Sequence, residues 1–194
     1  MPSVGLLIEF NNGQVKAANF GMATAARADN HQIVALVVDA AAETAGTALE
    51  AYGVDRVVNI RTGASGWDPA LRAAAILAAM EKFEIRSLIG LTSPAGRELL
   101  PRVAARLDAP LVMDCIEIDL KAHRVKTSQY SGKTIATITL TGKHFIYGLR
   151  PNAVEPVMSP ATAAPTRWTS GVLVKPPRAI PWCWWTGGGS MRRT

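Results

Sequence analysis

Short apolar runs alternate with longer alanine-rich segments along the first 120 residues of the chain. The apolar runs have the length of buried strands and lie at Val4–Ile8, Ile33–Val38, Arg56–Ile60, Ser87–Leu91 and Leu111–Ile118. The alanine-rich segments have the length of helices and lie between these runs, at Ala17–Ala28, Ala41–Tyr52, Pro69–Phe83 and Ala95–Leu107. Near-continuous apolar strands joined by helices are typical of a parallel sheet that is buried on both faces. This pattern predicts an α/β fold with a mainly parallel sheet and crossover helices.

Local residues support the bounds of three of these helices. The pairs Asp68–Pro69 and Ser93–Pro94 are typical of a helix N-cap followed by a proline in the first turn. Gly53 follows a helical segment at the place of a C-terminal cap. Pro101 lies inside the last helical pattern, where it removes one backbone hydrogen bond. The residues leave two possibilities open, a kinked helix or a short turn followed by a helix that begins near Leu100.

The pattern changes after residue 120, where β-rich runs follow one another without helices between them. The runs lie at Arg124–Tyr130, Thr134–Leu140 and His144–Leu149, and they are separated by Ser131–Lys133 and Thr141–Lys143. Short gaps that contain glycine between alternating strands are typical of hairpins. We therefore expect the sheet to end in an antiparallel β meander. Residues 1–157 are predicted to form one domain, and residues 158–194 an irregular or disordered basic tail rich in proline, tryptophan and glycine.

Composition excludes several classes of protein. The chain has 194 residues, of which 48% are apolar, so it can bury a real core and is not disordered along its whole length. No apolar run reaches the roughly 18–20 residues of a spanning helix, and the N-terminus lacks the layout of a signal peptide. Two cysteines are too few for a disulfide scaffold or a metal knuckle. We expect a cytoplasmic protein that does not insert into a membrane.

The formal net charge of +6 and the isoelectric point near 9.7 would favour an acidic partner if the charge were spread over the whole chain. It is not evenly spread. Residues 1–150 carry a net charge of +2, and residues 151–194 carry +4. The same last segment holds seven of the twelve prolines and four of the five tryptophans. The excess positive charge belongs to the tail. Such charge together with tryptophans could hold single-stranded nucleic acid, but we expect no nucleic-acid partner.

One turn is a candidate anion site. Thr92–Arg97 follows a predicted buried strand and opens a helix, so its backbone amides can hold an anion near Ser93 and Gly96, with Arg97 assisting. A well-capped helix in which Gly96 allows close packing explains the same residues more simply. Ser131–Thr134 resembles the end of a phosphate loop, but its place between two β-rich runs is typical of a β-turn.

Residues suited to catalysis are scattered. His31, His123 and His144 are far apart and have no metal-binding spacing, so we interpret them as surface or strand-end histidines. Cys115 lies in the fifth predicted strand, where we expect a buried small residue and not a nucleophile. The residues therefore predict neither a metal site nor a catalytic set.

Four motifs occur in order after residue 91. They are TSPAGRELLPRVAARL at Thr92–Leu107, then Asp114–Cys115, then Tyr130–Lys133 with Ala136–Ile138, and finally Arg150–Ala153. With the opening strand at Val4–Glu9 and the Asn-Gly turn before Lys16–Ala17, they strongly resemble the N-terminal domain of the electron-transfer flavoprotein alpha subunit. The resemblance covers about residues 3–157.

The resemblance implies an adenine-nucleotide-hydrolase-like α/β fold and a role as an electron carrier rather than an enzyme. In such flavoproteins an alpha and a beta subunit form a heterodimer that takes electrons from acyl-CoA dehydrogenases, in fatty-acid and amino-acid oxidation, and delivers them to a quinone oxidoreductase. It also implies that FAD is held mainly by the C-terminal domain of alpha, and AMP by the beta subunit. Residues matching recurring family positions are implied to serve the fold or the interface: Arg97, Pro101, Arg102, Tyr130, Lys133, Arg150 and Asn152.

The chain departs from the family pattern after Met158, where a flavin domain is expected. Proline, tryptophan, arginine and glycine crowd together there, as they do when GC-rich coding DNA is read out of frame. We hypothesise a frameshift or premature truncation near residue 160, with a natural short protein bearing an interaction tail as the alternative. The chain alone is then expected not to hold FAD. The alternative function is a stand-alone adenine-nucleotide-binding module that uses the Ser93–Arg97 turn.

Overall fold

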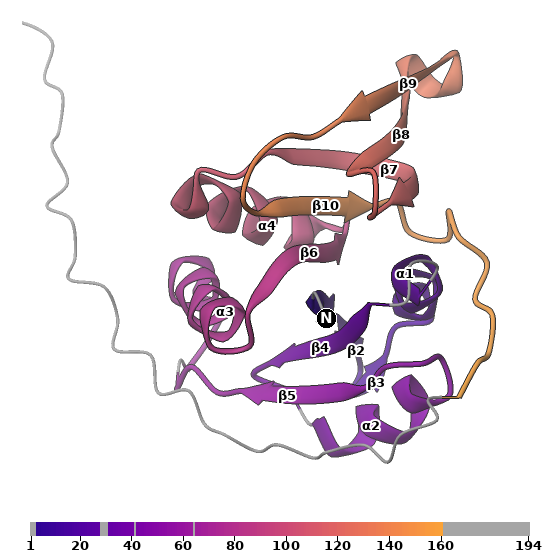
Figure 1. Ribbon diagram of the computed structural model, residues 1–194. Helices are drawn as coiled ribbons and strands as arrows, with labels where there is room; N and C mark the ends of the chain where they lie inside the picture. The colour runs from indigo at the N-terminus through magenta and orange to yellow at the C-terminus, as the bar shows by residue number, and fades with distance from the viewer. Residues whose placement is uncertain (1–2, 28–30, 41, 64, 161–194) are drawn as a thin grey trace, which may run out of the picture.

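The computed structural model describes residues 3–27, 31–40, 42–63 and 65–160, which form helices on both sides of one large sheet (Figure 1). The strands are β1 (Ser3–Ile8), β2 (Phe10–Asn11), β3 (Gln14–Val15), β4 (Gln32–Val38), β5 (Arg56–Ile60), β6 (Ile85–Leu91), β7 (Leu111–Asp119), β8 (Arg124–Gln129), β9 (Thr134–Thr139) and β10 (Phe145–Leu149). The helices are α1 (Ala18–Arg27), α2 (Ala42–Glu50), α3 (Pro69–Lys82), α4 (Pro94–Leu107) and the short 3-10 helix η1 (Tyr130–Gly132). All of the predicted tail except residues 158–160 lies outside the described residues, and so does the segment on which the frameshift hypothesis rests.

The main sheet has eight strands in the order β5-β4-β1-β6-β10-β7-β8-β9. The six strands from β5 to β7 are parallel to one another, and β8 and β9 continue the sheet with antiparallel pairing. The α/β fold, the mainly parallel sheet and the antiparallel strands near its end are therefore as predicted. From β1 the chain builds outward through β4 and β5 on one side, and then crosses to β6 on the other. The order of strands thus reverses between β1 and β6, which is where sheets of this kind form ligand sites.

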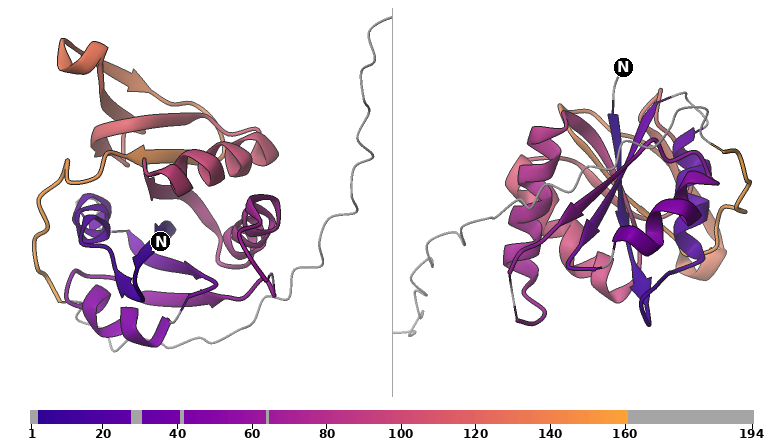
Figure 2. Two further views of the ribbon diagram at one scale, coloured as in Figure 1. Left: turned by 180° about the vertical axis from the view of Figure 1, so that it is seen from behind. Right: turned by 90° about the horizontal axis from the view of Figure 1, so that it is seen from below.

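Two layers of helices cover the sheet, with α1 and α2 on one face and α3 and α4 on the other (Figure 2). Alternate side chains of each central strand enter two separate cores because successive residues of a strand point to opposite faces. In β4, Ile33, Ala35 and Val37 pack toward α1 and α2, whereas Val34 and Leu36 pack toward α3 and α4. Strand β4 is therefore apolar from Ile33 to Val38, which is why the sequence predicted it.

The predicted helix ends are confirmed. The Asp68 carboxylate accepts hydrogen bonds from two backbone amides in the first turn of α3, and the Ser93 hydroxyl caps α4 by accepting one, from the Gly96 amide. Gly53 adopts a left-handed φ of +83° just after α2. Pro101 neither ends α4 nor opens it, because the helix runs without a break from Pro94 to Leu107. Buried neighbours such as Leu100 and Val103 hold it on the sheet despite the missing hydrogen bond.

The second predicted hairpin is wrong. Thr141–Lys143 does not join two antiparallel neighbours, because β10 lies between β6 and β7 and is parallel to both. Every residue of β10 is buried, including Ile146 and Tyr147, whose side chains enter opposite cores. A strand of this composition belongs in the middle of the sheet, whereas the glycine-containing gap before it looks like a local turn. The first hairpin, from β8 through η1 to β9, is confirmed.

Strand β7 is bulged, and the antiparallel strands that follow it fold back over the sheet. Its register shifts against both neighbours, and Asp114 has a φ of +59° at the bulge. Bulges of this kind bend a strand. As a result His123, just beyond the end of β7, stacks on Phe145 at the start of β10, with their ring centres 3.6 Å apart. Residues from the end of β7, β8 and the end of β9 then complete the core under α1.

The segment after β10 runs as an extended strap past α1 to the end of α2 (Figure 1). The Val157 amide donates to Thr24 Oγ1 at 3.0 Å, and Arg27 donates to the Val157 carbonyl at the same distance. The Ser159 amide donates to the Ala51 carbonyl at 2.9 Å. The strap therefore ties the last described residues to the helices formed from the first third of the chain.

Candidate functional site

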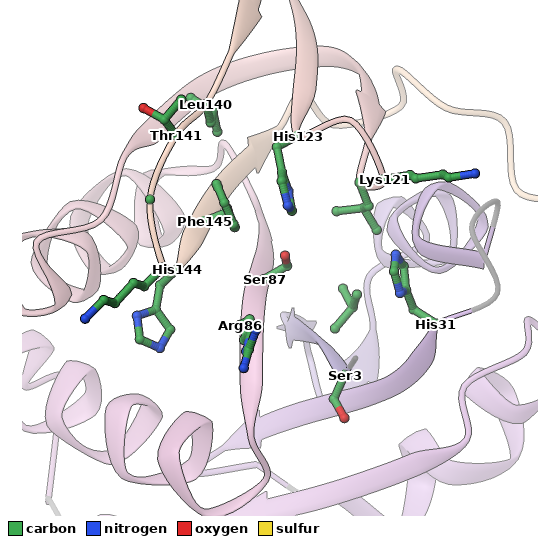
Figure 3. Close-up of a pocket in the computed structure, with 14 residues that line it drawn as sticks. Ser3, His31, Arg86, Ser87, Lys121, His123, Leu140, Thr141, His144 and Phe145 are labelled. Atoms are coloured by element: carbon green, nitrogen blue, oxygen red, sulfur yellow. The ribbon is translucent and has the colours of Figure 1, made fainter. Parts of the chain in front are cut away.

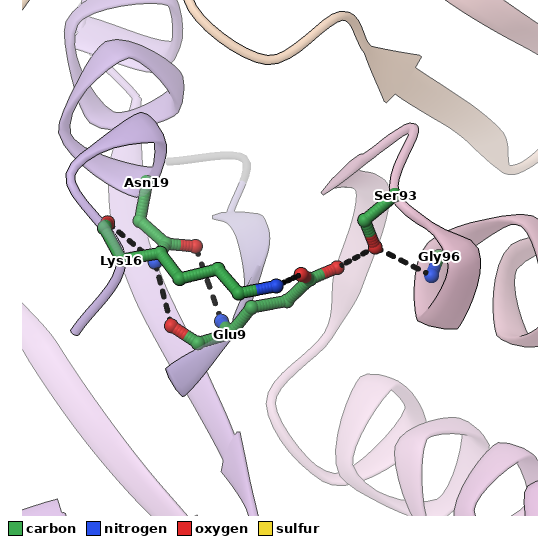
Figure 4. Close-up of polar contacts among 5 residues, drawn as sticks. All are labelled: Glu9, Lys16, Asn19, Ser93 and Gly96. Carbon is green, nitrogen blue, oxygen red and sulfur yellow. Dashed lines mark hydrogen bonds and ion pairs between the residues drawn. The ribbon is translucent and has the colours of Figure 1, made fainter. Parts of the chain in front are cut away.

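The candidate turn of the sequence lies where the strand order reverses, at the carboxyl ends of β1 and β6. Ser93 and Gly96 open α4 just after β6, and Glu9 follows β1 directly beside them (Figure 4). Helix N-termini at this place in parallel sheets commonly hold phosphate groups.

Glu9 fills the space in front of the turn. Its carboxylate accepts a hydrogen bond from Ser93 Oγ and forms an ion pair with Lys16 Nζ at 2.6 Å (Figure 4). The Glu9 side chain is only 10% exposed. A protein carboxylate therefore already supplies the negative charge that a helix N-terminus favours. A phosphate at the same place would meet the charge of Glu9 at close range.

Asn19 holds the backbone of Glu9 in position. Its side-chain oxygen accepts from the Glu9 amide at 3.1 Å, and its Nδ2 donates to the Glu9 and Lys16 carbonyls at 2.7 and 2.8 Å. Asn19 is completely buried at the start of α1. The β2–β3 hairpin between Glu9 and Lys16 is closed by this amide, so the carboxylate and its ammonium partner are fixed together.

Ser93 and Gly96 have structural duties in the turn. Ser93 Oγ accepts from the Gly96 amide at 3.0 Å, which completes the helix cap. A Cβ atom on Gly96 would lie 1.8 Å from the Leu91 carbonyl oxygen, closer than any two such atoms can approach. The glycine is therefore required for α4 to begin so near the end of β6. The geometry favours the capped-helix interpretation over an anion-binding turn.

Arg97 points to a different partner, Asp114 at the bulge of β7. Arg97 approaches Asp114 at 3.3 Å, and Arg150, just after β10, approaches the same carboxylate at 3.6 Å. The Asp114 amide donates to Thr92 Oγ1 at 3.1 Å, which holds the bulge in place. All three charged side chains are more than a third exposed, so each pair contributes little to stability. The sequence placed Arg97 and Arg150 in separate motifs, and the fold brings them to one carboxylate.

A pocket of about 250 Å³ adjoins Glu9 on the other side, between β1, β4 and α3. Its charged residues are already paired, because Arg72 contacts Asp39 at 3.2 Å while Lys16 contacts Glu9. The Arg72 guanidinium also lies over the Trp67 ring, 4.5 Å from its centre. Ligand pockets usually enclose about 300–1,000 Å³. The pocket is thus too small for FAD, and its two carboxylates oppose a dinucleotide, so the described residues at the switch point do not fit this cofactor.

The cysteine among the scattered candidates lies in the core of the fold. Cys115 is fully buried, and burial, aided by the charge of Asp114, raises the pKa of its thiol to about 12. It is therefore the buried small residue that the sequence predicts, and not a thiolate nucleophile. Among the described residues no group of three histidine, cysteine or carboxylate side chains is placed to hold a metal ion.

The other residues matched to the family lie apart from this site. Arg102 pairs with Glu98 on α4, with nitrogen and oxygen 3.6 Å apart. Tyr130, which is 77% exposed, and Lys133 lie at the tip of the β8–β9 hairpin, and Asn152 has a φ of +61° in the turn after β10. Their proposed interface role stays a prediction. The sequence analysis missed Glu9 and Asn19 as residues of this site. A lone carboxylate directly after the first buried strand could have pointed to Glu9, because sites in parallel sheets form at the carboxyl ends of strands.

We expect Ser93→Ala to destabilise the domain by about 1–2 kcal/mol. The change removes the cap of α4 and leaves one oxygen of the buried Glu9 carboxylate without its hydroxyl donor. Urea unfolding followed by circular dichroism measures the loss. Ser128→Ala, on the half-buried surface of β8, is the control and should change stability by less than about 0.5 kcal/mol. Equal stability of the two variants would show that Ser93 contributes nothing as a cap.

The sequence of this chain matches a known protein family. The model of the electron transfer flavoprotein domain matches residues 4–172, which extends past Met158. In the described part of the chain, no helix combines the length and apolar character that crossing a bilayer requires.

Three curated relatives are all electron transfer flavoprotein alpha subunits. The protein of Syntrophomonas wolfei is 22% identical over 175 residues, covering 84% of this chain and 55% of the relative. That of Bacillus subtilis is 22% identical over 160 residues, with coverages of 77% and 48%. That of Pseudomonas aeruginosa is 27% identical over 167 residues, with coverages of 86% and 53%. The chain spans about half the length of the curated relatives it matches. From the matched family model, which covers most of its residues, the chain belongs to the electron transfer flavoprotein domain family and is related to the alpha subunits of that family.

Proposed function

We propose that residues 1–157 act as the N-terminal lobe of an alpha-type electron-transfer flavoprotein subunit. In this role the chain pairs with a beta subunit and belongs to an electron carrier, not to an enzyme with its own substrate. The carrier takes electrons from acyl-CoA dehydrogenases in fatty-acid or amino-acid oxidation and passes them to a quinone oxidoreductase. The family match and the alpha subunits among the relatives support this proposal.

One observation carries the assignment of this lobe to a structural rather than a cofactor-holding role. The site where a parallel sheet of this kind binds nucleotides is closed from within, by the Glu9 carboxylate between Ser93 and Lys16. In this proposal FAD is held by a flavin domain and AMP by the beta subunit, and neither is held by the described residues. The same closure argues against the chain as a stand-alone adenine-nucleotide-binding module.

The test is flavin content and partner binding of the purified chain. Expressed alone, the chain should show no flavin absorbance near 450 nm and less than about 0.1 FAD per chain after denaturation and extraction. Co-expressed with the beta subunit of an electron-transfer flavoprotein, it should elute from a size-exclusion column as a one-to-one complex. The matched control is the Pseudomonas aeruginosa alpha subunit with its own beta subunit, carried through the same preparation.

Two results would contradict this proposal. Stoichiometric FAD in the chain expressed alone would show that this lobe holds the cofactor after all. A folded chain that never co-elutes with any beta subunit, while the control pair does, would remove its place in the carrier.

A further inference from the structure

All three histidines of the chain line one cleft, although they are far apart in the sequence. The cleft has a volume of about 1020 Å³ and lies near the amino ends of β1, β6 and β10, at the opposite ends of the strands from Glu9 (Figure 3). His31 comes from the segment before β4, His123 from the turn after β7, and His144 from the segment before β10. The bend of β7 adds His123 to the other two, because it carries the turn with His123 back to the start of β10.

The ionisable side chains of the cleft wall are all basic within the described part of the chain. They are His31, Arg86, Lys121, His123, Lys143 and His144, and no carboxylate accompanies them. Arg86 and Lys143 take part in no ion pair among the described residues. Concave surfaces lined by charges of one sign focus their field, and here the field attracts anions. This contrasts with the carboxyl end of the sheet, where each cation near Glu9 has a carboxylate partner.

Two histidines bring polar groups into the cleft that the described residues satisfy only in part. His31 Nε2 is buried and has no hydrogen-bond partner among the described residues. Burial lowers the pKa of His123, and the neighbouring His31 lowers it further, while Asp119 acts in the opposite direction. The Tyr147 hydroxyl, 3.3 Å from His123 Nδ1, is the other polar group against that ring. Figure 3 shows His123 and Ser87 directed toward each other across the cleft.

We propose that this cleft binds a small molecule that carries a diphosphate or larger polyphosphate group. Separate cations around a hollow of this size suit an anion with several charged oxygens, because guanidinium and ammonium groups are the usual partners of phosphate. Leu120, Leu140 and Phe145 form an apolar part of the wall, which suits an organic group attached to the phosphates. The proposal is independent of the electron-carrier role, since it uses the other end of the sheet.

The experiment is a titration of the purified full chain with pyrophosphate at pH 7 by isothermal titration calorimetry. We expect one site per chain. The double variant Arg86→Gln/Lys143→Gln should weaken binding at least tenfold, because it removes two cations of the cleft wall that form no ion pair with the described residues. The control Arg61→Gln/Lys126→Gln removes the same charge outside the cleft wall and should change the affinity by less than about twofold. A second titration with a nucleoside diphosphate tests whether the cleft also contacts the organic part of the ligand. Tighter binding than that of pyrophosphate would show such contacts, and equal binding would show that the phosphates alone are recognised.

Histidine resonances give an independent readout. Since the chain has three histidines and all line the cleft, every imidazole signal in an NMR spectrum reports on it. Pyrophosphate should move these signals in the unaltered chain and in the control, and should raise the pKa of His123. Absence of binding at millimolar pyrophosphate, or equal binding by the two double variants, would overturn the proposal. Imidazole signals that do not move during a calorimetrically observed binding event would overturn it too.

Discussion

Replacing Gly96 with alanine should destabilise the domain by about 3 kcal/mol or more. The added Cβ would meet the Leu91 carbonyl oxygen at 1.8 Å, and the obstacle is backbone rather than a movable side chain. The first turn of α4 must then move away from the end of β6, which breaks the Ser93 cap and uncovers Leu99 and Leu100. For a domain of this size the change corresponds to a melting temperature lower by roughly 6–12 °C.

Gly46→Ala is the matched control for this prediction. Gly46 lies inside α2, and a Cβ there would contact only the end of the Glu50 side chain, at 3.6 Å. Alanine is the better helix former by about 1 kcal/mol, so this variant should be as stable as the original chain or more so. Differential scanning calorimetry should therefore show a lower melting temperature for Gly96→Ala and an equal or higher one for Gly46→Ala. A Gly96→Ala protein that melts within 2 °C of the original would contradict the close approach of α4 to β6.

Replacing Asn19 with alanine should cost about 2–3 kcal/mol of folding free energy. The Glu9 and Lys16 carbonyls keep other donors, since the Lys16 amide donates to Glu9 at 3.0 Å and the Asn19 amide to Lys16 at 3.0 Å. The Glu9 amide, however, loses its only acceptor found in the described residues, the Asn19 side chain. A buried amide left without a partner costs about 1–3 kcal/mol, to which two lost donor bonds add.

The control is Asn11→Ala, on the exposed side of the β2–β3 hairpin, which should change stability by less than about 0.5 kcal/mol. Chemical denaturation measures the free energy of unfolding of both variants, and hydrogen exchange of the Glu9 amide measures the local loss of protection. Exchange of the Glu9 amide should accelerate in Asn19→Ala far more than exchange in β4. Unchanged protection at Glu9 would mean that Asn19 does not hold this backbone.

Most elements of the fold were predictable because each is decided by residues close together in the sequence. Strand β4 is apolar on both faces, and α3 and α4 carry their own caps at Asp68 and Ser93. The place of β10 was not predictable in this way. Nothing in Phe145–Leu149 says which two strands it separates, because that depends on contacts with β6 and β7, which precede it by tens of residues.

The candidate site shows the same division. The turn at Ser93–Arg97 was found from its cap, its glycine and its place after a strand. Its true partner was not, because Glu9 precedes Ser93 by 84 positions. The three histidines were dismissed on their spacing in the sequence. They meet in one cleft because His31 and His144 lie just before the parallel strands β4 and β10, and the bend of β7 brings His123 to the same end of the sheet. Long-range pairs of this kind are decided by topology, which local patterns do not contain.

The central position of β10 has a consequence for how the chain is made. A ribosome releases β1, β4, β5 and β6 first, and these strands are already neighbours, so half of the sheet can assemble during synthesis. Strand β7 can pair with β8 at once, but it cannot join the parallel strands before β10, which lies between it and β6 and emerges about thirty residues later. Until then the edge of β6 and the apolar side of α4 are open to solvent and to other chains. The interval between residues 111 and 149 is therefore when the nascent protein most needs a chaperone, and when a pause in translation would do most harm.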